Sequence, residues 1–276
     1  VDELCNFEKM EDAIYRNDEG EIRVGECYEG PGSHWLPRLG PSCLSRQSYA
    51  RTALIEGLRQ EEKIGVNPFK FGISASTDTH NAIGGAINED NFPGHLGKSD
   101  AEIADRLSLE SGKTGGISTN PGGLIGVWAE ENTRDSIFDA MQRREVFGTS
   151  GPRMKVRLFG SWDFDEKLCR NSENLNIAYA NGVPMGQDMP SKTGNTPSFL
   201  VQAQADSGGL DVAPGNHLQR VQIIKGWIGD DGHHHQKVYD VAGNSNNGAS
   251  VNIDTCEPTG TGYRSLCSVW KDPEFD

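Results

Sequence analysis

The first part of the chain carries a helical hydrophobic pattern. Apolar positions recur at intervals of three to five residues from Tyr49 to Leu58, and Gly65 follows the last periodic residue. This pattern predicts an amphipathic helix that begins at Ser45 or Ser48 and ends at Gly65. Its expected buried stripe comprises Tyr49, Ala53, Leu54 and Leu58.

Strand-like and helical segments then alternate. Apolar runs predict strands at residues 69–75, 124–129 and 146–149. One further helix is expected from Ser99, where Ser99 and Glu102 form a capping box. Another is expected after Asn132 or Thr133, with a buried stripe of Ile137, Phe138 and Met141. Helices alternating with strands predict an α/β layout for residues 1–152.

The pattern changes near Gly151 and Pro152. Beyond this point, hydrophobic and polar residues alternate in short runs separated by turn-rich stretches, which predicts strands. The runs are residues 155–159, 199–203, 221–227, 237–241 and 265–270. No helical pattern stands out among them, so residues 153–276 are expected to form a β-rich, sandwich-like module.

Composition narrows the classes of partner. The 276-residue chain carries a net charge of −14 and has a pI near 4.9. Nucleic acid is therefore an unsuitable partner, because a phosphate backbone needs a basic surface. No apolar run is long enough to span a bilayer. The chain also lacks a phosphate-binding P-loop, a dinucleotide fingerprint and a serine-hydrolase elbow.

The six cysteines contain no Cys-x-x-Cys pair. Cys27 and Cys43 bracket one turn-rich loop, and Cys256 and Cys267 bracket another. Both pairs are disulfide candidates, which favours a periplasmic or secreted protein; the alternative is free, buried thiols. Cys5 and Cys169 have no evident partner in the sequence.

Asp78 and His80 are the leading candidates for chemistry. They are two residues apart, directly after the predicted strand 69–75, so in extended backbone they point to the same side. A carboxylate and an imidazole converging at a strand end suit a divalent metal. The alternative is an ordinary turn cap, because Asp-x-His alone is a weak signal.

Other polar residues have less specific contexts. Asn81 and His95 follow in a glycine-rich loop and are candidates for substrate contact or support of the ligands. Arg153 either clamps an anionic substrate or braces the junction between the two halves. His233 and His235 follow a predicted hairpin turn at residues 230–232 and would share a face that could bind an adventitious metal, although a solvated hairpin tip is the simpler interpretation.

Several longer strings carry a resemblance to known proteins. At Asp78-Thr79-His80 the chain resembles the final metal-binding motif of the PHP (polymerase and histidinol phosphatase) metallohydrolase superfamily. Further strings resemble a PHP-like bacterial family catalogued as domain of unknown function 3604. They are residues 66–72, 120–124, 127–134, 149–153, 218–222 and 269–273.

The resemblance implies the C-terminal part of a (β/α)7-like barrel followed by the β module. Related proteins carry a His-x-His strand and further His and Glu ligands in an earlier segment, which is missing here, so that N-terminal half of the barrel is an expected partner. The implied activity is hydrolysis of a small-molecule phosphoester or other ester with Zn, Mn or Fe, and this chain alone is expected to be inactive. The alternative is a non-catalytic, secreted ligand-binding or structural protein.

Overall fold

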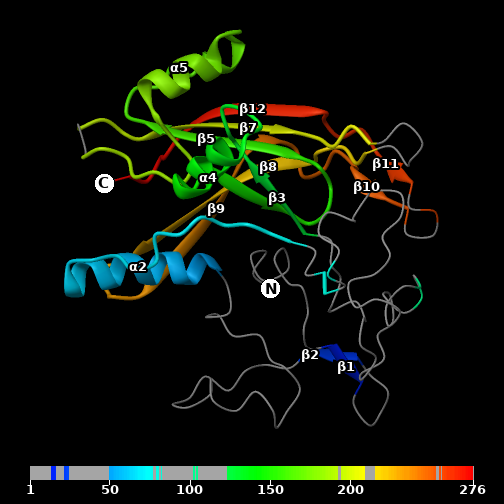
Figure 1. The fold of residues 1–276 in the computed structure, drawn as a ribbon, viewed down its shortest axis with the longest axis horizontal. Helices are drawn as coiled ribbons and strands as arrows, with labels where there is room; N and C mark the ends of the chain where they lie inside the picture. Colours follow the sequence, from blue (N-terminus) through cyan, green and yellow to red (C-terminus); the bar gives the residue numbers. More distant parts are fainter. Residues whose placement is uncertain are drawn as a thin grey trace. The chain divides into compact units, whose positions relative to one another are not determined.

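The computed structural model (Figure 1) describes part of the chain and groups it into two compact units. The described residues are 14–16, 22–24, 50–76, 79–80, 82, 102, 104, 123–191, 194–208, 215–252, 255 and 257–275. Unit 1 comprises residues 1–69, 77–121 and 226–235, and unit 2 comprises residues 70–76, 122–225 and 236–276. The boundary expected near residue 152 stays a prediction.

Helix α2 (Ala50–Ile64) is the main described element of unit 1. Gly65, with φ +76°, ends it as predicted, because glycine accepts this left-handed conformation without strain. The predicted buried stripe is partly wrong: Ile55 is 4% exposed, whereas Leu58 is 44% exposed. Ile55 lies against Gly226, where an added Cβ would come within 2.6 Å of its Cγ1 atom. A short antiparallel pair, β1 (Ile14–Arg16) and β2 (Ile22–Val24), also belongs to this unit.

A four-stranded antiparallel sheet forms the centre of unit 2. Its strand order is β12-β7-β5-β6. The strands are β5 (Lys155–Ser161), β6 (Val183–Pro184), β7 (Ser198–Gln204) and β12 (Ser265–Lys271). Predictions for the three long strands are confirmed, because alternation of side chains across the sheet is already visible in the sequence.

One face of this sheet is covered by helical segments. Phe159 and Leu200 are register partners in β5 and β7, and both are fully buried. They pack against Leu168 in η5 (Leu168–Arg170) and Ala178 in α5 (Asn174–Asn181). The expectation that no helix follows residue 152 is therefore wrong.

The other face packs against strand segments. Strands β8 (Arg220–Ile228) and β9 (His234–Gly243) form a two-stranded sheet. Tyr239 of β9 lies 4.9 Å, centroid to centroid, from Trp270 of β12. Ala203 and Leu218 form a second buried cluster near the start of β8. This part of the chain is β-rich, as predicted. A further short pair consists of β10 (Ser250–Val251) and β11 (Pro258–Thr259).

The remaining elements precede the central sheet in the sequence. Strands β3 (Leu124–Val127) and β4 (Val146–Thr149) pair antiparallel, joined through α4 (Arg134–Gln142). Thr133 caps α4 as predicted, accepting a hydrogen bond from the Ser136 amide at 3.3 Å. The predicted stripe is wrong at Phe138 and Met141, which are 57% and 50% exposed. Among the described residues, no sheet closes into a barrel.

Candidate functional site

The segment that leads to the Asp-x-His motif lies against β4. Residues 70–76 are irregular, so the predicted strand at 69–75 is wrong. An added Cβ at Gly72 would come within 3.0 Å of Val146, and one at Gly148 within 3.0 Å of the Ala75 amide nitrogen. From the first of these contacts to the second, the residue numbers rise in both segments, so the two segments run in the same direction. The segment therefore runs alongside β4 without pairing with it.

Two interactions fix the beginning of this segment. The Arg144 guanidinium donates a hydrogen bond of 2.7 Å to the Lys70 carbonyl, and the Lys70 ammonium lies 2.9 Å from the Asp188 carboxylate. Arg144 has φ +62°, directly after α4, a conformation that favours glycine. At the other end, an added Cβ at Gly123 would come within 2.8 Å of the Ser76 amide nitrogen.

The predicted metal ligands follow Ser76 in the chain. Asp78 lies outside the described residues, as do the substrate candidates Asn81 and His95. His80 is described and its side chain is exposed. Within the described part of the chain, no three His, Cys, Asp or Glu residues cluster as a metal site would require. The metal site thus stays a prediction that rests on the motif.

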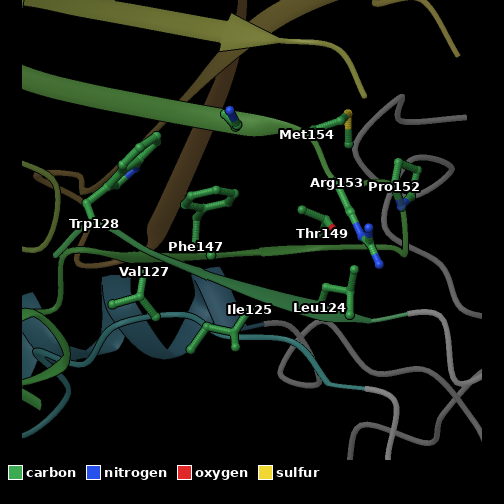
Figure 2. A pocket seen from close by; sticks show the side chains of 11 residues that line it. Leu124, Ile125, Val127, Trp128, Phe147, Thr149, Pro152, Arg153 and Met154 are labelled. Atoms are coloured by element: carbon green, nitrogen blue, oxygen red, sulfur yellow. The ribbon is translucent and has the colours of Figure 1, made fainter. Parts of the chain in front are cut away.

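A cavity of about 240 Å³ lies between the β3–β4 pair and the start of β5 (Figure 2). Trp128, Phe147 and Thr149 stand on one side of the pair, while Ile125 and Val127 point to the other side. The apolar part of its wall comes mainly from Leu124, Trp128, Phe147, Pro152 and Met154. Sequence reasoning missed this cavity, because these residues are apolar positions that a strand pattern alone would explain.

The Trp128 indole is fixed on two sides. Its Nε1–H donates a hydrogen bond of 2.9 Å to the Val156 carbonyl. The Arg157 guanidinium lies 3.5 Å from the ring centroid, a cation–π contact. Phe147 lies 6.0 Å away, centroid to centroid, at an angle of 33°. One aromatic wall of the cavity is therefore held in place before any ligand arrives.

Two cations complete the lining. Arg153 and Lys155 both line the cavity, and none of its described lining residues is acidic. The Arg153 amide donates a hydrogen bond of 2.6 Å to the Asp206 carboxylate, which is 7% exposed as a residue. The Arg153 main chain is thus braced, while its side chain lines the cavity. Both alternatives for Arg153, an anion clamp and a brace at the junction between the two halves, stay predictions.

A buried carboxylate lies close to Arg157. Glu145 is 4% exposed, and it accepts a hydrogen bond from the Tyr179 hydroxyl. Arg157 in turn donates to the Tyr179 oxygen at 2.8 Å. Burial raises the pKa of Tyr179, and its hydrogen bond to Glu145 raises it further. Sequence reasoning did not single out this network, because its members lie far apart in the sequence: Glu145 before β4, Arg157 in β5 and Tyr179 in α5.

The chain matches the family described as "Protein of unknown function (DUF3604)" over residues 31–276. It belongs to that family. No curated protein matches this DUF3604 chain. No solved structure matches it either. Family membership confirms the resemblance at the level of this family, whereas the broader likeness to PHP metallohydrolases stays a proposal.

The disulfide of this DUF3604 chain differs from the predicted pairing. Cys267 of β12 bonds to Cys169 of η5, with 5.8 Å between their Cα atoms. A cysteine forms one disulfide, so the expected pairing of Cys256 with Cys267 is wrong. Cys27, Cys43 and Cys256 lie outside the described residues, and the pairing of Cys27 with Cys43 stays a prediction. The prediction considered only cysteines that bracket a single loop. It therefore missed a bond between two cysteines that are 98 positions apart in the sequence.

Two of the three histidine side chains at the β8–β9 turn contact carboxylates. His235 Nε2 lies 3.0 Å from the Asp231 carboxylate, and its ring stacks on Trp227 at 5.5 Å. His234 Nε2 lies 2.9 Å from the Glu56 carboxylate of α2. Burial raises the pKa of Glu56, but hydrogen bonds from Gln60, Arg59 and His234 outweigh it and lower that pKa overall.

No helix within the described ranges is long and apolar enough to cross a bilayer.

Proposed function

We propose that this DUF3604 chain is the C-terminal portion of a PHP-like, metal-dependent hydrolase. Asp78 and His80 would be its metal ligands. The observation that carries the proposal is the Asp-x-His motif at the end of a segment that runs alongside β4. The resemblance implies that this motif stands at the end of a late barrel strand, which is where barrel enzymes place catalytic residues.

The residue types suit a divalent ion. Carboxylate oxygen and imidazole nitrogen are ligands shared by Zn, Mn and Fe sites. A divalent ion held at Asp78 and His80 would supply Lewis-acid polarisation of an ester oxygen and an activated water. Catalytic zinc sites use three protein ligands, so two are too few. The resemblance implies that the remaining His and Glu ligands come from the N-terminal half of the barrel.

The substrate proposed is a small phosphoester or another small ester. Asn81 and His95 are candidates for contacting it or for orienting the ligands. Arg153 is the candidate for binding its anionic group, because a guanidinium pairs well with phosphate and carboxylate oxygens. Of Asn81, His95 and Arg153, only Arg153 belongs to the described part of the chain.

Metal content tests the proposal directly. Protein expressed from the complete gene would be analysed for Zn, Mn and Fe by elemental mass spectrometry. We expect stoichiometric metal in the natural protein and loss of most of it in Asp78→Ala and His80→Ala. Asp135→Ala and His233→Ala are matched controls, because both residues are exposed and lie outside the motif. Metal-free natural protein, or equal loss in the controls, contradicts the proposal.

Activity provides the second measurement. The same preparations would be tested on aryl phosphates, aryl sulfates and aryl carboxylates, with and without a chelator. Turnover that depends on metal and is lost in Asp78→Ala supports the hydrolase. Full metal occupancy with no turnover of any ester class favours the alternative of a non-catalytic binding protein, for which the cavity beside Trp128 is the supporting observation.

We also propose a periplasmic or secreted location. The Cys169–Cys267 disulfide supports it, because such bonds form and persist in oxidising compartments. Fractionation of the native organism, followed by non-reducing peptide mapping, tests this. Recovery of the protein in the cytoplasmic fraction with both thiols free contradicts it.

A further inference from the structure

We infer that the cavity beside Trp128 is a binding site for a small anion that carries a single hydrophobic ring. This cavity lies wholly within unit 2, and the inference does not rest on the proposed metal site. The ligand class is defined by an aromatic body and one carboxylate or phosphonate-type head. Three properties of the cavity lead to it: size, the nature of its walls, and charge.

Size limits the ligand to about one ring. The cavity holds about 240 Å³. An apolar cavity of roughly 150 Å³ is enough to bind benzene. The remaining volume accommodates a short acidic group and little else. Larger fused rings and peptides would have to extend outside the cavity.

The walls favour an aromatic body. Trp128 and Phe147 lie on the same side of the β3–β4 pair, and Figure 2 shows both rings standing toward β5. Gly126, the register partner of Phe147, makes this possible, because an added Cβ would come within 2.7 Å of the Phe147 Cε2 atom. The ring of Trp128 is already held by Val156 and Arg157. A flat ligand ring therefore meets a preformed aromatic surface, with little ordering cost on binding.

Charge selects an anion. Arg153 and Lys155 line the cavity two residues apart, and Arg157 lies two residues further along β5. Lys155 and Arg157 share a face of the strand because side chains alternate. The lining that the structure describes holds both cations and no carboxylate, in a chain whose net charge is −14. A cationic, partly apolar recess on an acidic protein attracts anions and rejects cations.

Ligand pairs test this without any change to the protein. Binding of phenylphosphonate and phenylacetate would be measured by calorimetry and ligand-observed NMR, with the whole chain, in a chelating buffer. We expect dissociation constants of about 0.1–1 mM for both. Benzyl alcohol keeps the ring without the charge, and acetate keeps the charge without the ring. Each is expected to bind at least about tenfold more weakly, since it makes half the contacts.

Two variants locate the site. Arg153→Gln and Lys155→Gln should each weaken phenylphosphonate binding about three- to tenfold. Lys167→Gln is the matched control, because it removes an exposed lysine that does not line this cavity and should leave the dissociation constant unchanged. The chelating buffer removes any divalent ion, so binding that persists in it separates failure of the inference from failure of the hydrolase proposal.

The inference is overturned by any of three results. Absence of measurable binding of both aryl anions at 5 mM, about five times the weakest expected constant, excludes the site. Equal binding of benzyl alcohol means that the cavity is only apolar and the cations do not participate. Equal binding to the natural chain, Arg153→Gln and Lys155→Gln places the anion elsewhere on the protein.

Discussion

The Phe147 ring lies directly across Gly126, its register partner in the β3–β4 pair. A methyl group at Gly126 would overlap the ring, so the absence of a side chain at one position determines where the aromatic wall of the cavity stands. The glycine at position 126 of the sequence therefore helps to set the geometry of the candidate binding site.

Gly126→Ala should destabilise the protein by about 1–3 kcal/mol, because the added methyl forces Phe147 off its position in a packed region. The free energy of unfolding in urea measures this. Phe147→Leu shortens the opposing side chain, so in that background Gly126→Ala should cost less than about 0.5 kcal/mol. Equal costs in the two backgrounds would show that the two residues do not interact.

Removing the Cys169–Cys267 disulfide should lower the free energy of unfolding by about 2–5 kcal/mol. The bond closes a long loop and so restricts the unfolded chain, with a sequence separation of 98. The double variant Cys169→Ser/Cys267→Ser would be compared with the natural chain by denaturant unfolding. In a reducing buffer the difference between them should largely disappear. A peptide map that links Cys267 to Cys256 instead would contradict the structure.

Tyr179→Phe should destabilise unit 2 by about 1–3 kcal/mol, because it leaves the buried Glu145 carboxylate without the phenolic donor. Tyr263→Phe is the control, since Tyr263 has a similar exposure, 38% against 45% for Tyr179, and no described hydrogen bond joins it to Glu145. Denaturant unfolding at neutral pH measures both variants. A loss in Tyr179→Phe no larger than that in the control would show that the Glu145 contact contributes nothing.

Stability should also fall at alkaline pH. Burial and the hydrogen bond to Glu145 raise the pKa of Tyr179 above its ordinary value of 10.0, so the folded state holds the phenolic proton more tightly than the unfolded state. Its contribution is fully present below pH 10.0 and is lost as the pH rises through the folded pKa. Unfolding curves at several pH values should show this loss in the natural chain and a smaller one in Tyr179→Phe.

The contact between His234 and Glu56 should make α2 sensitive to acid. Burial raises the pKa of Glu56, but hydrogen bonds from Gln60, Arg59 and His234 lower it below its ordinary value of 4.5. The stabilisation is present above pH 4.5 and is lost as the pH falls through the lowered pKa. Helical circular dichroism should therefore fall less steeply with acid in Glu56→Gln than in the natural chain. Glu62→Gln, an exposed change on the same helix, should follow the natural curve.

Local patterns predicted several elements correctly. Gly65 ends α2 and Thr133 caps α4, because both signals act through the backbone of neighbouring residues. The long strands of the central sheet followed from alternation with a period of two. Helix α5 was missed, since Asn174–Asn181 has no amphipathic stripe and no side-chain cap. It depends on Ala178 and Tyr179 packing against β5.

The two candidate sites also differ in whether the local sequence could predict them. The Asp-x-His motif was visible because both residues lie within three positions, so spacing alone describes them. The cavity was not visible, since its aromatic wall and its cations come from β3, β4 and the start of β5. The same reason explains the corrected cysteine pairing, in which Cys169 and Cys267 meet only after the central sheet forms.

The sequence by itself therefore determined the strand and helix boundaries that depend on near neighbours, the family, and the motif at Asp78 and His80. The tertiary structure decided which side chains are buried, which cysteines bond, and where Trp128, Phe147 and Arg153 surround a common space. The physical reason is that backbone preferences act over a few residues, whereas packing and charge pairing join residues that the chain separates by tens of positions.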